Sequence, residues 1–421
     1  MSEAAIIPSS GQVKTNRGAI LGSAVIVSGT ATGAGMFSMP VATSGMWFVP
    51  SLLMLLFVWF CMYSASLYLL EANMRFPIGA SFDSIAEKTI GNIGRLINGL
   101  SVGFVCYVLT YAYISGGSSI ISHSLKAVAD ITLAPSYSSL IFAVVLSSIV
   151  VLGTRAVDRV TTALLGGMVI SFLGFTSGLV TQAESQLLFP ALQSSDTLPY
   201  AFAALSFVTV SFGFQNCVPS ITRYLKKDAH AVRKALLWGS LITLVFYIVW
   251  LISIFGNLGR DQFPAVIAQG GNIGSLIRAL EANGLQSGMS NILQLFSNMA
   301  VASSFLGVSL SLFDYIADLF GFGHDLKGRL KTAAVTFIPP TLLGVLLPNG
   351  FIAAIAFAGV GMEVFCIITP VLMAWVGRKN NAEGYQVSGG KLRMMLVMGF
   401  GILSLVLAAL DSFSLLPWFG K

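Results

Sequence analysis

Long apolar runs separated by short polar segments fill the chain and predict membrane-spanning helices. A helix needs about 20 apolar residues to cross a bilayer. Eleven runs approach or exceed this length, at residues 18–42, 46–71, 96–122, 137–153, 160–181, 198–220, 234–256, 289–319, 332–347, 350–376 and 394–415. The two longest segments between them, 183–197 and 257–288, contain Pro, Gly and a few charges. We expect outer loops or short surface helices there and no inserted soluble domain.

The composition narrows the class to a helical membrane protein. Hydrophobic residues make up 55% of the 421 residues and charged residues 10%, whereas soluble domains carry about 25% charged residues. This excludes a soluble enzyme, a nucleic-acid-binding protein, a disordered regulator and a secreted disulfide scaffold. A transmembrane barrel would show short alternating segments instead of continuous runs. The cysteines lie in apolar runs without metal-binding spacing and are expected to be packing residues: Cys61, Cys106, Cys217 and Cys366.

The distribution of basic residues predicts the orientation. With the N-terminus inside, 19 of the 23 Lys and Arg residues fall on the cytoplasmic side, where basic residues are enriched in membrane proteins. One helix more or fewer would destroy this division. We therefore expect a cytoplasmic tail over residues 1–17, an uncleaved first helix and a C-terminus outside the cell. The net charge of +6 then reflects orientation and not nucleic-acid binding.

Two of the runs carry helix-breaking residues at corresponding places. In the first run, residues 29–40 contain three glycines within seven residues and then Pro40. In the sixth run, Ser211–Ser220 contains Gly213, two amide side chains and Pro219. Unpaired main chain is tolerated in a bilayer only where protein buries it or where it lines a cavity. Matching interruptions in two halves of a chain therefore indicate a transporter binding site.

The spacing of these interruptions predicts two repeats. Runs one and six are five helices apart, and an odd number of helices per repeat inverts the second repeat. We expect a first repeat over 18–181, an inverted second repeat over 198–376, and an additional eleventh helix and outer C-terminus over 394–421. The alternative for the first run is that Gly29 and Gly33 form a small-xxx-small helix-packing motif.

Interrupted helices provide a specific binding chemistry. Main-chain N–H groups at the start of a half-helix carry partial positive charge and bind a carboxylate. Free carbonyl groups at the end of the other half bind an ammonium group or a cation. Together they form a receptor for a zwitterion, which indicates an amino acid substrate and needs no charged side chain.

The third run offers a polar aromatic face that includes Tyr107, Thr110, Tyr111 and Ser115. Tyr107 and Tyr111 are one helical turn apart. Either a phenol here donates to the substrate carboxylate, or the two rings pack with their hydroxyl groups bonded to neighbouring groups. The sequence favours neither alternative.

The eighth run places Ala300, Ser303 and Ser304 on one helix face. Their two hydroxyl groups, together with freed carbonyl groups of Gly29 and Thr32, would suit a small hard cation with oxygen ligands. The alternative is hydrogen bonding between helices.

Glu363 lies near the middle of the tenth run. An ionisable residue is costly in a bilayer and indicates function, so Glu363 is a candidate proton carrier. The alternative is a hydrogen-bonded structural acid.

At several of these positions the chain resembles the bacterial hydroxy and aromatic amino acid permease family, and the resemblance covers essentially the whole chain. The matching stretches are Gly33–Phe37, Leu70–Asn73, Tyr111–Ser115, Ser211–Phe214, Val218–Ser220, Ala300–Gly307, Leu312–Tyr315, Ala317–Phe320 and Pro348–Phe351. The chain departs from the family at Gln215-Asn216, where His-Gly is usual, and at Glu363, where no acid is expected.

The resemblance implies an all-α, LeuT-type 5+5 inverted-repeat fold with discontinuous helices 1 and 6. It also implies proton-driven uptake of tryptophan or tyrosine, with the substrate's amino and carboxylate groups at the two interruptions. In sodium-coupled relatives of the wider fold, a sodium site has the spacing of Gly29, Thr32, Ala300, Ser303 and Ser304. Sodium coupling therefore remains an alternative to proton coupling.

The resulting expectation is an inner-membrane symporter, not an enzyme, that works by alternating access in the lipid bilayer, without a cofactor and as a monomer. The expected substrate-binding residues are Ala31, Thr32, Gly33, Ala34, Gly35, Tyr107, Tyr111, Ser211, Phe212, Gly213, Phe214 and Gln215. The expected ion-coupling residues are Gly29, Thr32, Ala300, Ser303, Ser304 and Glu363. No catalytic residue or certain metal ligand is expected. A channel or sensor is a remote alternative, because no filter motif is found.

Overall fold

The structure, a computed structural model, describes residues 17–420 except 34, 79, 81, 324 and 381–383. All secondary structure in this part of the chain is helical. The elements in order are α1 (Arg17–Ala31), α2 (Gly35–Thr43), α3 (Phe48–Met74), α4 (Phe82–Ala129), α5 (Pro135–Leu152), α6 (Thr154–Gln182), α7 (Ser185–Leu188), η1 (Ser194–Asp196), α8 (Leu198–Ser211), η2 (Gln215–Cys217), α9 (Val218–Tyr224), α10 (Ala229–Phe255), η3 (Arg260–Gln262), α11 (Phe263–Ala268), α12 (Ile273–Ala282), α13 (Ser287–Phe320), α14 (Leu326–Leu346), α15 (Phe351–Glu363), η4 (Val364–Ile368), α16 (Thr369–Asn380) and α17 (Gly390–Ser412).

Every predicted run coincides with one of these helices or with a group of consecutive ones. In the described residues, nine spans are long and apolar enough to cross a membrane, and the bent pair α1 and α2 makes a tenth. The run at 332–347 forms α14, which is 21 residues long but is not among these ten candidates. Three basic residues near its start and Pro339 and Pro340 reduce its apolar character. The chain is a multi-pass membrane protein, and the count of eleven crossings stays a prediction.

The structure corrects the sequence prediction at two places. The third run belongs to the 48-residue α4, which starts well before residue 96 and is kinked at Gly91. Gly91 has a φ of 76°, a conformation that glycine adopts without steric cost. In the segment 257–288, short helices form as expected, but α11 and α12 are not superficial, because Phe263, Leu276 and Ile277 are fully buried.

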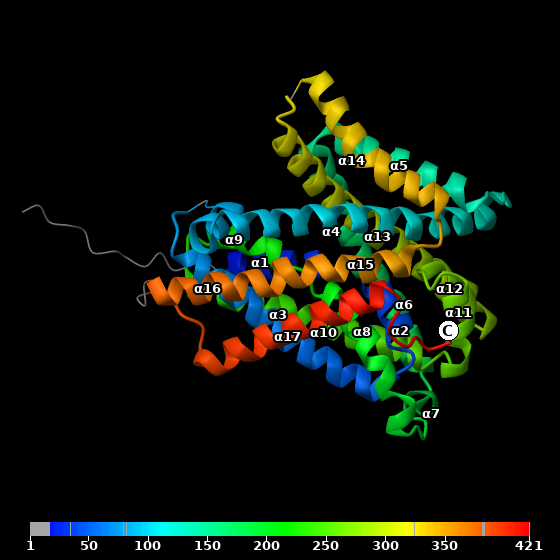
Figure 1. Cartoon of the computed structure of the whole chain (residues 1–421). Coiled ribbons are helices and arrows are strands. Elements are labelled where there is room, and N and C mark those ends of the chain that lie inside the picture. The colour runs from blue at the N-terminus through cyan, green and yellow to red at the C-terminus, as the bar shows by residue number, and fades with distance from the viewer. Residues whose placement is uncertain are drawn as a thin grey trace, which may run out of the picture.

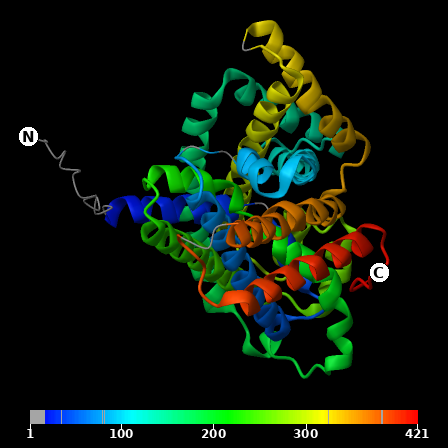
Figure 2. The same cartoon turned by 60° about the vertical axis from the view of Figure 1, so that its left-hand side comes forward.

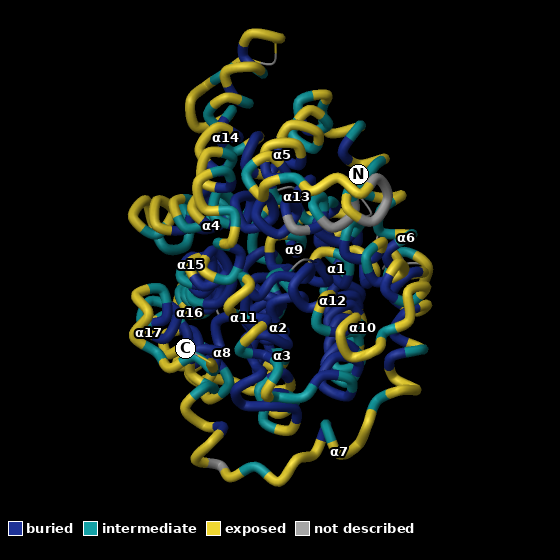
Figure 3. The backbone as a smooth tube through the Cα atoms, turned by 90° about the vertical axis from the view of Figure 1, so that its right-hand side faces the viewer, coloured by how far each residue is buried: buried dark blue, intermediate teal, exposed yellow. Residues whose placement is uncertain are grey.

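The long helices run side by side, and α5 and α14 pair with each other to one side of the others, as Figures 1 and 2 show. The view along the bundle in Figure 3 shows buried chain gathered in the centre and exposed residues on the outer helices. The exposed residues include many large apolar side chains, such as Ile170, Leu173 and Leu403. A surface of this kind suits lipid and not water.

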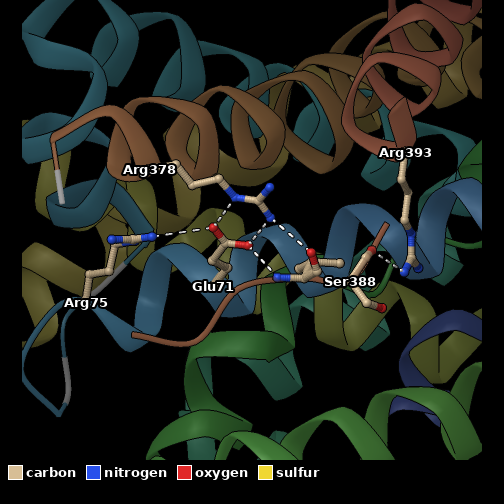
Figure 4. A network of polar contacts seen from close by, with 6 residues as sticks. Glu71, Arg75, Arg378, Ser388 and Arg393 are labelled. Atoms are coloured by element: carbon tan, nitrogen blue, oxygen red, sulfur yellow. Dashed lines mark hydrogen bonds and ion pairs between the residues drawn. The ribbon is translucent and has the colours of Figure 1, made fainter. Parts of the chain in front are cut away.

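A buried ion-pair network joins the end of α3 to α16 and to the segment before α17. The guanidinium of Arg378 donates two hydrogen bonds, each 2.6 Å long, to the carboxylate of Glu71, which is fully buried. The main-chain N–H of Val387 donates to the same carboxylate over 2.8 Å, and Arg75 lies 3.5 Å from it. Figure 4 shows Glu71 between the two arginines. These contacts hold Arg378 at the end of α16 and Val387 before α17 against the end of α3.

Candidate functional site

The first interrupted helix breaks between α1 and α2. The helix ends at Ala31 and resumes at Gly35, and the two halves are bent by 56°. Thr32 and Gly33 lie in the break, and Ala34 falls outside the described residues. The hydroxyl of Thr32 is buried and makes no hydrogen bond. The break thus leaves an unpartnered polar atom together with the terminal main-chain groups of two half-helices.

The second interrupted helix breaks after Ser211. Residues 212–214 separate α8 from η2, and α9 follows with Pro219 in its first turn. A Cβ at Gly213 would lie 2.0 Å from Cε of Met362 on α15, so a larger residue here would displace the Met362 side chain. Phe212 and Phe214 on either side of it are fully buried. Both interruptions predicted from the sequence are therefore present in the structure.

The two interruptions lie side by side at the centre of the bundle. The hydroxyl of Ser211 donates to the main-chain carbonyl of Gly35 over 3.1 Å. The hydroxyl of Tyr247 on α10 donates to the carbonyl groups of both Ala31 and Ser211. One turn further along α10, the indole N–H of Trp250 donates to the carbonyl of Met36 over 3.1 Å. Together these bonds connect three of the half-helices, α1, α2 and α8, to one another and to α10.

Sequence reasoning missed Tyr247 and Trp250. Both are fully buried, although each carries a polar group. The available signal was a pair of polar aromatic residues, three positions apart, in an otherwise apolar run. Buried tyrosine hydroxyl and tryptophan N–H groups usually have a hydrogen-bond partner, so this pair indicated a polar partner somewhere in the core. It did not indicate which one.

The residues after Ser211 form an aromatic and amide layer around the second break. The ring of Phe212 packs edge-on against Tyr247, with centroids 5.1 Å apart. The side chain of Gln215 accepts a hydrogen bond from the N–H of Phe214 over 3.0 Å and donates to the carbonyl of Met62 on α3 over 3.2 Å. Gln215 therefore holds the interrupted segment against α3, and both ends of its amide are occupied in this structure.

The structure does not bring Tyr107 and Tyr111 to the interruptions. Their hydroxyl groups donate to the carbonyls of Val335 and Leu347, over 2.9 Å and 2.8 Å. Of the two alternatives left open by the sequence, the observed contacts match packing with bonded hydroxyl groups. On the same helix, Tyr113 lies on a different face and is hydrogen-bonded to Ser304 of α13.

The face of α13 that includes Ser304 packs directly on the first break. A Cβ on Gly33 would lie 2.4 Å from the hydroxyl oxygen of Ser304. The hydroxyl of Ser303 donates to the carbonyl of Ala300 over 3.1 Å, and both residues are buried. Gly29 lies against Leu165 of α6. The structure thus brings Ser304 to the break containing Thr32, whereas Glu363 lies elsewhere, beside α8 and α17.

The arrangement of the helices is similar to that of a solved crystal structure. The crystal structure of MhsT in complex with L-phenylalanine aligns with a TM-score of 0.64 and 14% identity, covering 94% of this chain and 99% of that one. This similarity supports the predicted LeuT-type fold. The fold and the site together define the class of protein: an all-helical, multi-pass membrane bundle in which two interrupted helices meet at the centre.

The chain belongs to the tryptophan/tyrosine permease family, which it matches over residues 16–408. It is 43% identical to the tryptophan-specific transport protein of Pseudomonas aeruginosa (strain UCBPP-PA14), covering 96% of this chain and 98% of the relative. It is 38% identical to the low affinity tryptophan permease of Escherichia coli (strain K12), covering 94% and 96%. It is 35% identical to the tyrosine permease of Enterobacter agglomerans, covering 96% and 99%. A permease moves its substrate without converting it, so the role of the chain is not enzymatic.

Proposed function

We propose that this protein imports an aromatic amino acid, tryptophan first and tyrosine second, across the bacterial inner membrane by proton symport. The observation that carries the proposal is the meeting of two interrupted helices, joined through Tyr247 and Ser211. The main-chain N–H and carbonyl groups at the ends of the half-helices suit the carboxylate and amino groups of a zwitterion. Phe212 and Phe214 offer apolar surface for an aromatic side chain. The names of the relatives favour tryptophan over tyrosine.

The proposed mechanism is alternating access. Ala31, Thr32, Ser211, Phe212 and Phe214, which lie at the two interruptions, are buried in this structure. Access of a substrate to them therefore requires a movement of one group of helices relative to another. The ion and the substrate favour the same state, and this shared preference couples their movements. The excess of Lys and Arg in alternate loops supports a cytoplasmic N-terminus and a periplasmic C-terminus. We propose that a single chain is sufficient for transport.

Sodium coupling is the second candidate, and two observations favour it. The hydroxyl of Thr32 is buried at the first break without a hydrogen bond, and Ser304 of α13 reaches the same break. Hydroxyl and carbonyl oxygens of Gly29, Thr32, Ala300, Ser303 and Ser304 would be the ligands of the ion.

Uptake of labelled tryptophan into proteoliposomes tests the substrate and the ion together. An inward proton gradient is expected to drive accumulation, and a sodium gradient alone is not. Unlabelled tryptophan is expected to compete better than tyrosine, and a charged amino acid such as lysine is the control that should not compete. Accumulation that requires sodium and does not respond to the proton gradient would reject proton coupling in favour of sodium coupling. Absence of tryptophan uptake under either gradient would reject the proposed substrate.

Gly33→Ala is expected to reduce tryptophan uptake, because the added methyl group collides with the hydroxyl of Ser304. Overpacking of this kind typically costs about 1–3 kcal/mol. Adding Ser304→Ala removes the colliding atom and leaves the new methyl group 3.6 Å from Cβ of residue 304, an ordinary contact. Initial uptake rates and thermal stability in detergent measure both effects.

Gly307→Ala is the matched control for this prediction. Gly307 lies one turn after Ser304 on α13, and within the described residues a Cβ there would have no neighbouring atom within 4 Å, so alanine fits without displacement. The double variant is expected to recover thermal stability, and it recovers uptake only if the Ser304 hydroxyl is dispensable. Equal uptake by the Gly33→Ala and Gly307→Ala variants would contradict the close packing of α13 on the first break.

A further inference from the structure

Glu363 is a buried acid outside the interruptions. It ends α15, is fully buried, and accepts a hydrogen bond from the hydroxyl of Ser404 on α17. Its second carboxyl oxygen is buried and accepts no hydrogen bond. Within the described residues Glu363 forms no ion pair with a Lys or Arg side chain. A carboxylate in such a place is costly, so this closed arrangement suits the neutral, protonated form.

A row of hydroxyl groups surrounds this carboxyl on the side of α8. Thr209 lies beside it, donates to the carbonyl of Leu205 over 2.9 Å, and is 3.5 Å from the Ser404 hydroxyl. Ser206, one turn before Thr209 on α8, has a fully buried hydroxyl without a hydrogen bond. Gly359, one turn before Glu363, allows this approach, because a Cβ there would lie 2.0 Å from the Ser206 oxygen.

A second buried carboxyl group lies farther along α17. Asp411 lies two turns after Ser404, a rise of about 10 Å, and it is also buried. Its carboxylate accepts a hydrogen bond of 2.6 Å from the indole of Trp418 in the C-terminal segment. The side chains of residues 405–410 are apolar, so the polar groups of this part of α17 lie at two levels, one beside Glu363 and one near the end of the helix.

The main chain after Glu363 is irregular, and the neighbours of Glu363 in the chain contact the second interrupted segment. The five residues after it, Val364–Ile368, form a π-helical turn, a feature that is frequent at functional sites. The residue before it, Met362, fills the space beside Gly213. Cys366, in the π turn, lies beside the main chain of Gln215. Met362 and Cys366 thus connect the chain around Glu363 to the second interruption by direct contact.

We propose that Glu363 is the proton-binding residue of the transporter and that protons reach it from the Asp411 side along the hydroxyl groups of Ser206, Thr209 and Ser404. This inference rests on the proposed proton coupling. A proton from the outer solution binds the free carboxylate oxygen, and the neutral side chain stabilises the closed state. When the bundle opens to the cytoplasm, water reaches the carboxyl and accepts the proton. No other reactant is required.

The remaining ionisable groups around Glu363 do not replace it in this role. Cys61 of α3 and Cys366 of η4 face it and are thiols buried in apolar surroundings. Arg393, at the start of α17, donates to the hydroxyl of Ser64. It lies eleven residues before Ser404, a rise of about 16 Å, so it does not neutralise Glu363. Near the carboxyl, α8 contributes only hydroxyl groups.

Glu363→Gln in proteoliposomes tests this assignment, because the amide keeps the shape and cannot exchange a proton. We expect loss of tryptophan accumulation under a proton gradient by at least tenfold. Loss of tryptophan-dependent proton uptake, followed with an internal pH-sensitive dye, is expected to accompany it. Exchange of internal unlabelled for external labelled tryptophan should persist, because the zwitterion site is intact. Glu184→Gln, which neutralises an exposed acid between α6 and α7, is the control expected to behave as the parent protein.

Ser404→Ala is the second variant and keeps the carboxyl group. The variant removes the hydrogen bond from the Ser404 hydroxyl to the Glu363 carboxylate and so makes the charged carboxylate less stable. Uptake by the variant is therefore expected to fall, with rising pH, at a pH about 1 unit higher than uptake by the parent protein. Accumulation by Glu363→Gln comparable with that of the parent, or an unchanged pH profile of Ser404→Ala, would overturn the assignment. If a proton gradient does not drive tryptophan accumulation by the parent protein itself, the proposed proton coupling is rejected. If the parent protein responds to the proton gradient and both variants respond in the same way, the coupling stands and the role of Glu363 is rejected.

Discussion

Tyr247→Phe is expected to lower the rate of tryptophan uptake at least tenfold while leaving membrane insertion intact. The hydroxyl group of Tyr247 is the hydrogen-bond donor shared by the carbonyl groups of Ala31 and Ser211, one in each interrupted helix. Leaving a buried carbonyl without its donor costs about 1–3 kcal/mol, and 1.4 kcal/mol corresponds to a factor of about ten. Initial uptake rates in proteoliposomes, at matched protein content, measure the effect.

The chain offers a matched control in Tyr68→Phe. Tyr68 is also fully buried, but its hydroxyl group makes no hydrogen bond in the structure. Its ring, which lies 5.7 Å from the Arg378 guanidinium, is kept in the variant. We therefore expect uptake within about twofold of the parent, since no donor is lost. Similar rates for the two variants would show that the bridge between the interruptions has no part in transport.

Arg378→Ala is expected to be the most destabilising of the substitutions considered, by about 3–5 kcal/mol, the cost of leaving one partner of a buried ion pair without the other. Glu71 is fully buried and receives two hydrogen bonds from this guanidinium. Without it, the partners of Glu71 that remain within the described part of the chain are the Val387 N–H and the more distant Arg75. A large fall in the thermal midpoint of the detergent-solubilised protein measures the loss.

Arg95→Ala is the control for this prediction, because it removes ion pairs that are exposed and not buried. Arg95 contacts Asp83 at 2.7 Å and Glu87 at 3.1 Å, but all three side chains are 40–48% exposed. Exposed ion pairs contribute about 0–1 kcal/mol, so the thermal midpoint should change little. Arg378→Lys should lie between the two, because lysine keeps the charge but not the two-pronged geometry. A midpoint for Arg378→Ala as high as that for Arg95→Ala would contradict the structural role of the Glu71 network.

The helices and their interruptions could be predicted from the sequence because the bilayer imposes strict requirements. A spanning segment must be long, apolar and internally hydrogen-bonded. Gly33, Gly35 and Gly213 therefore stand out as positions where this rule is broken, and the structure has both breaks where the sequence placed them. The kink at Gly91 and the π turn after Glu363 were not predicted, because a single glycine or a buried acid does not specify such geometry.

The residues of the site were predicted less completely than its position. The polar aromatic face predicted from the sequence contains Tyr107 and Tyr111 but not Tyr113. In the structure Tyr113 reaches Ser304, and the other two face α14 and the residues after it. Tyr247 was not selected at all. In an ordinary amphipathic helix the apolar stripe identifies the buried face. A membrane helix is apolar toward both lipid and protein, so its sequence contains little information about which way each residue points.

By itself, the sequence determined that this is a multi-pass helical membrane protein, which family it resembles, and where two of its helices are interrupted. These properties follow from composition and from local main-chain requirements. Only the tertiary structure decided that Tyr247 joins the two interruptions, that Ser304 packs on Gly33, and that Glu363 meets Ser404 instead of the interruptions. Each of these contacts joins residues far apart in the chain, and the rotation and packing of whole helices select them.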